Sequence, residues 1–174
     1  GEPHGMIAIV QVRSATVADR GLIWALNGIP NVGATADPSF PLELTPRDVP
    51  PPEFPDLADV PDSFVSAGGD FVVVVDDGRI VGMGGYKRIS ELEAQVLRVR
   101  VHPAVRRRGV GRRLMEAIEA AAAAGGARRM VLETAENQPE AIAFYESIGY
   151  HQTGMESRPG WTWTLVWLAR DLGA

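Results

Sequence analysis

The sequence predicts a mixed α/β (α+β) fold, with a mostly antiparallel central sheet flanked by helices and one parallel crossover. Apolar runs at 71–75 and 80–86 are separated by Asp77-Gly78, a dipeptide that favours a tight hairpin turn, so these two strands are antiparallel. A strand, a helix and a second strand then follow at 93–101, 109–124 and 129–135. Strands joined through a helix lie parallel in a sheet. The two observations together require a sheet of mixed direction.

The N-terminal part of the chain is expected to form a short strand and a helix. The apolar run 7–12 predicts the strand, and Ser14 or Thr16 can cap a helix that extends to about Ala25. Residues 30–61 hold nine of the 13 prolines of the chain, so we expect a long loop without regular structure there. A loop of this length in a small domain is commonly a lid, a binding loop or a disordered segment.

The predicted crossover shows the periodicity of both kinds of element. In the strand 93–101, alternation predicts apolar residues on one face and basic residues on the other, with Leu97, Val99 and Val101 opposite Arg98 and Arg100. In the helix 109–124, apolar residues recur at helical spacing and form one stripe, which consists of Val110, Leu114, Ile118 and Ala121.

Glycines and a proline mark the later boundaries. Gly125-Gly126 ends the helix of the crossover. Pro139 suits the first position of another helix, which ends before Gly149. An aromatic-rich strand at 162–168 is expected to close the fold.

Length and composition restrict the classes of protein. At 174 residues the chain suits a single domain, 1–174, that can bury a core, and residues 1–5 ahead of Met6 are expected to be a cloning remnant. No apolar run approaches the roughly 20 residues of a membrane span and no signal-peptide pattern is visible, which predicts a cytoplasmic protein without a membrane partner. The absence of cysteine excludes disulfides and thiol nucleophiles. The histidines lack metal-site spacing, so no metal is expected.

Charge is distributed unevenly along this acidic chain. The net charge is −5, yet 16 of the 17 basic residues are arginine and Lys87 is the single lysine. Seven acidic residues lie within 37–62, whereas seven arginines lie within 98–113 with no acid among them. A nucleic-acid-binding domain is normally basic overall. One compact basic patch on an acidic chain fits a small anionic ligand better, so no nucleic-acid partner is expected.

The basic patch centres on Arg-Arg-Arg-Gly-Val-Gly at 106–111, between a strand and a helix. Unpaired N–H groups and the helix dipole make such a position an anion site. Cations there destabilise a helix by about 0.3–1 kcal/mol each unless an anion is bound. The dinucleotide fingerprint is excluded because Leu114 stands at its third glycine, and the Walker loop is excluded because Arg112 follows Gly111. The alternative is an exposed arginine cluster without a ligand.

The pattern Arg-x-x-Gly-x-Gly in this position resembles the pyrophosphate-binding loop of the GNAT superfamily of N-acetyltransferases, which use acetyl-CoA. The preceding Val101-His102-Pro103 is similar to the family's lead-in to that loop. The segment 137–150 also resembles the family, since an asparagine, Ala-Ile, Phe-Tyr and Gly-Tyr follow a strand in the family's order. Considered singly, Asn137 could cap a helix and Tyr145 could be a core residue. Two signatures in the family's order favour the resemblance.

The resemblance implies that the two strands of the crossover splay apart and that acetyl-CoA lies in the gap. Backbone groups near Val99 and Val101 would pair with the pantetheine arm, the N–H groups of 106–112 would hold the pyrophosphate, and Asn137 would bond to the arm. The full set of implied cofactor-binding residues is Val99, Arg100, Val101, Arg106, Arg107, Arg108, Gly109, Val110, Gly111, Arg112, Asn137 and Tyr145.

The resemblance further implies direct transfer of the acetyl group to a primary amine in a ternary complex. A backbone N–H near Val99 can stabilise the oxyanion, and Tyr145 would protonate the departing thiolate. An alkyl amine with a pKa of about 10.4 is neutral in only about one part in a thousand at pH 7, so a base is expected.

The residues do not supply that base at the family's usual position. The glutamate that some family members use falls at Gln95, counted back from Gly109, and an amide cannot act as a base. We predict that Glu93, on the same strand face, acts through water, although it could equally be a solvated residue at a strand end. Glu133 and Glu136 are further candidates.

The acceptor is expected to be a small-molecule or peptide amine. The acids of 30–61 could steer a cationic amine toward the site or could simply be solvated. The four tryptophans could line an acceptor pocket, although core packing is the commoner role. A non-catalytic acyl-CoA sensor is an alternative that Gln95 permits and that Asn137 and Tyr145 disfavour. A homodimer is compatible with the resemblance.

Overall fold

The computed structural model describes residues 10–29 and 36–173. The predictions for residues 1–5, for the first half of the strand at 7–12 and for 30–35 lie outside this part of the chain.

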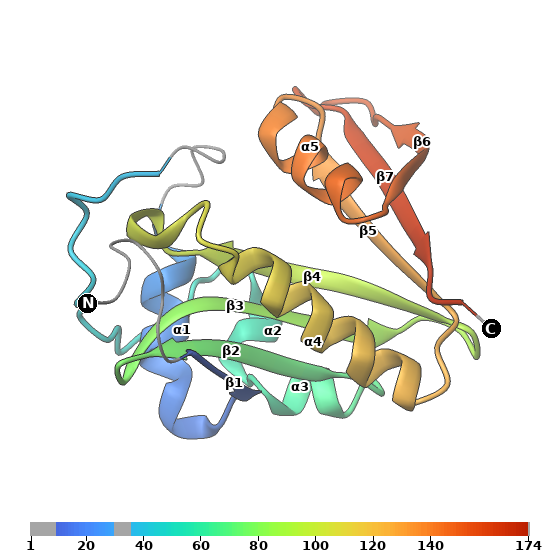
Figure 1. Cartoon of the computed structure of the whole chain (residues 1–174). Coiled ribbons are helices and arrows are strands. Elements are labelled where there is room, and N and C mark those ends of the chain that lie inside the picture. The colour runs from blue at the N-terminus through green and yellow to red at the C-terminus, as the bar shows by residue number, and fades with distance from the viewer. Residues whose placement is uncertain (1–9, 30–35, 174) are drawn as a thin grey trace.

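A seven-stranded sheet forms the centre of the molecule (Figure 1), in the order β1-β2-β3-β4-β5-β7-β6. Neighbouring strands are antiparallel except β4 and β5, which run parallel. The predicted mixed, mostly antiparallel sheet is therefore confirmed. The strands are β1 (Val10–Ser14), β2 (Asp70–Asp76), β3 (Arg79–Arg88), β4 (Glu93–Val101), β5 (Arg129–Ala135), β6 (His151–Glu156) and β7 (Leu165–Asp171).

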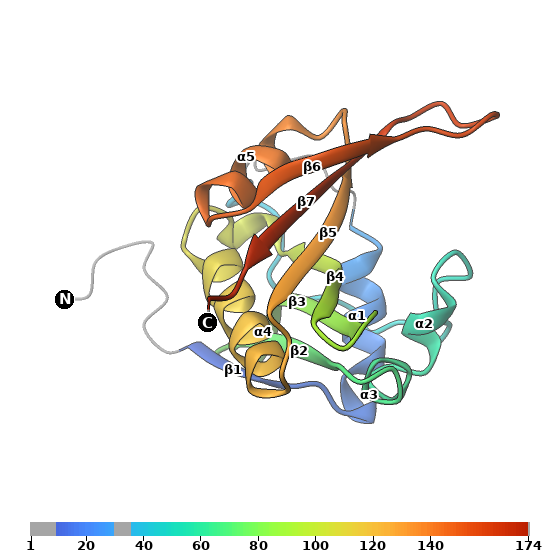
Figure 2. The same ribbon diagram turned by 90° about the vertical axis from the view of Figure 1, so that its right-hand side faces the viewer.

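Helices cover both faces of the β1–β4 part of the sheet (Figures 1 and 2). The long α4 packs on one face, and α1, α2 and α3 lie on the other, so two separate apolar cores form. On α4, Leu114, Met115 and Ile118 are fully buried, which contributes about 1.5–3 kcal/mol for each side chain. The helices are η1 (Val17–Asp19), α1 (Arg20–Asn27), α2 (Pro55–Ala58), α3 (Asp62–Val65), η2 (Pro103–Val105), α4 (Val110–Ala124) and α5 (Pro139–Ser147).

The local signals in the sequence give most boundaries correctly. Asp77 and Gly78 both have positive φ, 50° and 77°, as a tight hairpin turn with the twist of the flanking strands requires. The predicted strands at 93–101 and 129–135 coincide with β4 and β5. Pro139 is the first residue of α5, and Gly125 follows the last residue of α4.

Three predictions of secondary structure are wrong. The strand β6 was not expected, because its residues are almost all exposed and show no apolar alternation; it forms by pairing with β7 at the edge of the sheet. The closing strand was expected at 162–168, but β7 begins only at Leu165. The short helix α2 interrupts the proline-rich segment that was expected to lack regular structure, with Pro55 at its first position.

A buried histidine anchors the segment 36–54, which lies outside the helices and strands. His102 is fully buried, and its ring accepts a hydrogen bond at Nδ1 from the Ala104 N–H at 3.1 Å. Its Nε2 therefore carries the proton and donates to the Pro41 carbonyl at 2.9 Å. Burial lowers the pKa of His102, which keeps the ring neutral. The Asp37 N–H donates to the Pro103 carbonyl nearby, at 2.9 Å.

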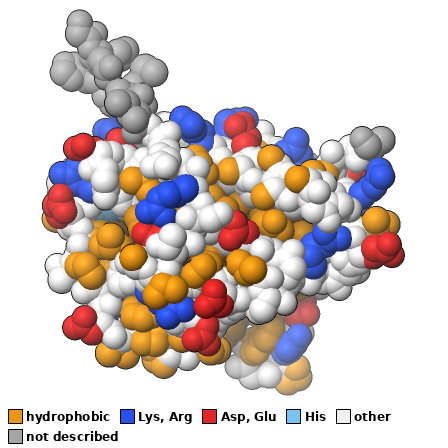
Figure 3. Space-filling model, turned by 90° about the horizontal axis from the view of Figure 1, so that it is seen from below, with side chains coloured by type: hydrophobic (Ala, Val, Ile, Leu, Met, Phe, Trp, Pro, Cys, Tyr) orange, Lys and Arg blue, Asp and Glu red, His pale blue; other side chains and the backbone are white. Residues whose placement is uncertain are grey.

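Acidic and basic side chains alternate over the face of the molecule seen in Figure 3, and no broad region of that face has a single sign of charge. Among the described residues, no helix is long and apolar enough to cross a membrane. The same residues contain no group of three or more His, Cys, Asp or Glu side chains that could hold a metal ion.

Candidate active site

A bulge in β4 shapes the site. Leu97 pairs with Gly85 and Arg100 with Met83, so β4 carries one more residue than β3 between these pairs. Arg98 takes up the extra length with a φ of 60°, a conformation that costs a side-chain-bearing residue roughly 1–2 kcal/mol. The expected alternation is therefore wrong here. Leu97 packs with the core under α1–α3, whereas Val99 and Val101 pack with the core under α4.

β4 and β5 pair only over their first three residues and then separate. The parallel ladder joins Glu93 to Arg129, Ala94 to Met130 and Gln95 to Val131. The two ribbons then diverge toward the end of the sheet where α5 lies (Figure 1). The later part of β4 therefore has an edge whose backbone groups are not used by β5. Side chains cover two of its carbonyls, since Arg100 Nη1 donates to the Val99 oxygen at 3.0 Å and Arg106 Nε donates to the Val101 oxygen at 3.3 Å.

The loop that follows β4 presents backbone N–H groups at the start of α4. Arg107 and Gly109 are both in the left-handed region, with φ of 66° and 81°, and such turns bring successive N–H groups together into an anion-binding concavity. The first bond of α4 runs from the Arg113 N–H to the Gly109 carbonyl at 3.0 Å. The N–H groups of the three residues before Arg113 therefore have no partner within the helix.

A cavity of about 300 Å³ connects this loop with the edge of β4 and with α5. Its position between the splayed strands and a helix N-terminus suits a long anionic ligand. Its lining consists of Val99, Arg100, Val101, Arg106, Arg107, Gly109, Gly111, Arg112, Glu140, Ala141, Phe144 and Tyr145.

Nine of the predicted cofactor-binding residues line this cavity, and three do not. Arg108 is exposed at the tip of the loop. The Val110 side chain is buried in the core beneath α4. Asn137 is exposed in the turn between β5 and α5. The sequence analysis missed Glu140, Ala141 and Phe144, although their spacing with Tyr145 places all four on one face of α5.

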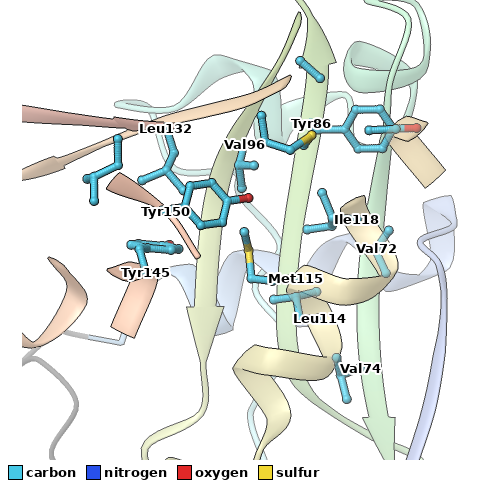
Figure 4. Close-up of a cluster of buried hydrophobic side chains, with 14 of the residues drawn as sticks. Val72, Val74, Tyr86, Val96, Leu114, Met115, Ile118, Leu132, Tyr145 and Tyr150 are labelled. Carbon is cyan, nitrogen blue, oxygen red and sulfur yellow. The ribbon is translucent and has the colours of Figure 1, made fainter. Parts of the chain in front are cut away.

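The hydroxyl-bearing residue of the cavity is Tyr145 of α5, which is buried at 9% exposure. It lies beside Tyr150 and near Leu132 of β5 (Figure 4), with the two tyrosine rings edge to face at 5.8 Å. Burial raises the pKa of Tyr145 to about 12, and the positive charge of Arg100 opposes that rise. The phenol therefore keeps its proton at neutral pH.

A buried polar network holds the neighbouring ring in place. The Tyr150 hydroxyl donates to Glu119 Oε2 of α4 at 2.7 Å, and Arg170 Nη1 of β7 donates to Oε1 of the same carboxylate at 2.7 Å. The two bonds join α4, β7 and Tyr150, which lies three residues beyond the end of α5. They fix the ring against which Tyr145 packs.

A second cavity, of about 170 Å³, lies beside the first, between β4 and β5. Val99, Arg100, Ala141 and Tyr145 line both cavities, so the two adjoin, and they are called the cleft below. The remaining lining of the second cavity consists of Val96, Leu97, Arg98, Leu132, Glu133 and Thr134.

The two candidate bases occupy different places. Glu133 of β5 lines the second cavity, and its pKa is raised first by burial and then by the charge of Glu156. Glu93 lies where β4 and β5 are still paired, lines a different pocket, and has its Oε2 3.7 Å from Arg129 Nε. The structure does not bring Glu93 to Tyr145, because six residues of extended strand separate Glu93 from Val99, roughly 20 Å at 3.3 Å per residue.

The tryptophans also lie away from the lining of the cleft. Trp24 packs against the core beside α2 and donates from Nε1 to the Leu57 carbonyl at 2.7 Å. Trp161 and Trp163 stack with ring centroids 5.3 Å apart in the connection between β6 and β7. Trp167 is in β7.

Comparison with known proteins identifies this architecture. Residues 37–150 match the model of the Acetyltransferase (GNAT) family. This match covers well over half of the chain, which therefore belongs to that family. Probable N-acetyltransferase family 8 member 5 of Mus musculus is 30% identical over 107 residues, a stretch that covers 59% of this chain and 47% of the relative. The chain thus spans about half the length of the curated relatives it matches.

Solved structures show the same fold at low sequence identity. A GNAT-family acetyltransferase from Staphylococcus aureus Mu50 superposes with a TM-score of 0.75 at 15% identity, over 95% of this chain and 100% of that one. A phosphinothricin acetyltransferase from Sinorhizobium meliloti, solved in complex with acetyl-CoA, superposes with a TM-score of 0.71 at 20% identity, over 94% and 89% of the two chains. The predicted GNAT fold is confirmed.

Proposed function

We propose that this chain transfers the acetyl group of acetyl-CoA to a primary amine by direct attack in a ternary complex. The observation that carries the proposal is the pair of adjoining cavities between β4 and β5, whose lining includes the arginine-glycine loop, a buried phenol and a carboxylate. The family relation and the acetyl-CoA complex of a structural neighbour support the choice of cosubstrate. Acetyl-CoA supplies the activated thioester.

The first cavity fits that cosubstrate chemically. Backbone N–H groups at the start of α4, with Arg106, Arg107 and Arg112 around them, would hold the pyrophosphate. The edge of β4 from Val99 to Val101 would pair with amide groups of the pantetheine arm. Arg100 and Arg106, which now donate to carbonyls of this edge, would then give up those contacts.

The second cavity would hold the acceptor. Glu133 is the base favoured by position, in place of Glu93. It would take a proton from the ammonium group of the acceptor, either directly or through one water, and leave a neutral amine that can attack. Its raised pKa suits this role, because a base works best when its pKa approaches the working pH. The amine nitrogen then forms a bond to the thioester carbon, the carbonyl oxygen becomes an oxyanion, and the nitrogen loses a second proton to solvent.

Two groups would stabilise the charges that develop. A backbone N–H of β4 near Val99 would bond to the oxyanion in a site with little water. As the carbon–sulfur bond breaks, the Tyr145 phenol would donate its proton to the thiolate. The Arg100 charge makes that donation easier, since it opposes the effect of burial on the Tyr145 pKa.

The proposal is tested by mixing the protein with acetyl-CoA and a panel of amines and measuring both free thiol and acetylated product. Stoichiometric release of the two supports an N-acetyltransferase. Acetyl-CoA that raises the melting temperature but releases no thiol with any amine would instead indicate a non-catalytic acyl-CoA sensor.

A further inference from the structure

The wall that β4 contributes to the second cavity carries two arginines, Arg98 and Arg100. The acidic residues of 30–61 could attract a cationic amine only if their charges were left uncompensated. Several of these acids are already engaged: Asp56 with Lys87 and Arg98, Glu43 with Arg79, and Asp62 with Arg20. The wall that β4 contributes to the second cavity is therefore positively charged.

Arg98 is held in a fixed position beside the cavity. Its Nε donates to Asp56 Oδ1 at 3.2 Å, and its guanidinium carbon lies 4.4 Å from the centre of the Phe54 ring. The other carboxylate oxygen of Asp56 accepts from Lys87 Nζ at 3.2 Å. One carboxylate thus serves two cations, and this cluster retains an excess positive charge next to the cavity. The bulge that gives Arg98 its positive φ puts its side chain on the face of the sheet that α1–α3 cover, the same face as Leu97.

Arg100 adds a second cation that lacks a counterion. Burial lowers its pKa, and among the oxygens of the described residues its side chain donates to the Val99 carbonyl, from Nη1. Its buried Nε has no hydrogen-bond partner, and no carboxylate of the described residues lies within ion-pair distance of it. A half-buried cation without a counterion is destabilising, so an anion entering the cavity would be stabilised there.

The opposite wall has the other sign of charge. Glu133 of β5 lines the same cavity, and its pKa responds to the charges of Glu156, Arg98 and Arg158. The cavity is therefore bipolar, with a carboxylate on β5 and guanidinium groups on β4. At about 170 Å³ it is smaller than the roughly 300–1,000 Å³ that drug-sized ligands occupy, so it suits a small molecule.

We propose that the acceptor is a small amine that also carries a carboxylate, of the α-amino-acid class, with its amine toward Glu133 and its carboxylate toward Arg98 and Arg100. This inference rests on the proposed acetyl transfer and narrows it. A peptide N-terminus or a polyamine places no carboxylate beside its amine, so it would leave Arg100 without a counterion and would leave the excess positive charge beside Arg98 unmatched.

The test compares matched acceptors on the intact protein. Standard α-amino acids are assayed with acetyl-CoA, each beside its carboxamide and its decarboxylated amine. Replacing the carboxylate by an amide lowers the amine pKa, which by itself would favour the carboxamide. We expect kcat/KM for the best amino acid to exceed that of both analogues by about tenfold or more, as for a charged hydrogen-bond partner.

Variants then locate the source of that preference. Arg98→Met keeps the apolar stem and leaves Asp56 paired with Lys87, and we expect it to raise KM for the amino acid and to reduce the preference to within about threefold. Arg98→Lys retains the charge and should retain more of the preference. Arg79→Met is the matched control, since Arg79 pairs with exposed Glu43 and lines neither cavity. Circular dichroism of each variant verifies the fold.

The outcomes separate this inference from the proposed function. Equal turnover of amino acids and their uncharged analogues would overturn the carboxylate assignment and leave acetyl transfer intact. A preference that Arg98→Met does not change, in a variant that folds, would also overturn it. Failure to acetylate any acceptor of either kind, while acetyl-CoA still binds, would overturn both.

Discussion

The two ends of strand β4 perform different tasks. At its start, Ala94 pairs with Met130 of β5, and both side chains are fully buried. At its end, Val99 and Val101 are only partly buried and line the cleft. The paired end holds the two parts of the sheet together, whereas the open end leaves backbone groups and charged side chains available to ligands. One strand thus supplies both stability and a site because its pairing with β5 stops after Gln95.

The bulge at Arg98 divides the two ends. It reverses the side-chain alternation, so that Leu97 faces one core and Val99 the other. The left-handed conformation of Arg98 costs roughly 1–2 kcal/mol, which the buried pairs at the closed end can offset. The comparison predicts that substitutions at the open end change catalysis and that those at the closed end change stability.

The largest effect is expected from Tyr145→Phe at the open end. Removing the phenol proton should lower kcat by about 10²–10⁴-fold with little change in stability, because the ring that packs against Tyr150 remains. Thiol release measures the rate. Tyr86→Phe, which removes a hydroxyl from a buried ring of β3 outside the cleft, is the control. An unchanged kcat for Tyr145→Phe would show that another group is the acid.

At the closed end, Met130→Ala should cost about 2–5 kcal/mol of unfolding free energy, since Met130 is fully buried against the core under α4. The KM for acetyl-CoA should stay close to the wild-type value. Chemical denaturation measures the loss. Met155→Ala on β6, where the side chain is 59% exposed, should change stability by less than about 0.5 kcal/mol. A loss at Met130 no larger than at Met155 would refute the structural role of the closed end.

Glu133→Gln should lower kcat/KM by roughly tenfold to a hundredfold at neutral pH. The base acts when deprotonated, so wild-type kcat/KM should fall as pH decreases through the Glu133 pKa, which burial places above its ordinary value of 4.5. The variant should lack this acidic limb. A pH–rate profile from pH 4 to 9 tests the assignment, and an acidic limb that persists in the variant would exclude Glu133 as its origin.

The smallest effect is expected from Glu93→Gln. The carboxylate lies at the closed end beside Arg129 and is 38% exposed, so its loss should change stability by less than about 1 kcal/mol. The rate should stay at the wild-type level, because the side chain lines neither cavity of the cleft. A hundredfold lower kcat/KM for Glu93→Gln would instead support Glu93 as the base, and it would contradict the conclusion that the paired end of β4 serves stability alone.

Features that depend on neighbouring residues were predictable from the sequence. The turn at Asp77-Gly78, the start of α5 at Pro139 and the glycine-bearing loop before α4 follow from backbone preferences and from the spacing of apolar residues. The position of Tyr145 in the cleft agrees with the family's second signature. The exposed strand β6 could not be predicted in this way, because its pairing with β7 alone makes it a strand.

The sequence by itself determined the family, the arginine-glycine loop before α4 and the phenol on α5, since each is encoded in a short continuous segment. Only the tertiary structure decided which carboxylate reaches the cleft and what Arg98 faces. Glu93 and Glu133 are both glutamates of strands. Glu93 lies where β4 and β5 are paired, whereas Glu133 lies beyond the point at which the pairing stops. Arg98 meets Asp56, 42 residues earlier in the chain, because the bulge inverts its face and α2 packs there. Strand register and long-range packing determine these positions, and local residue preferences do not predict either of them.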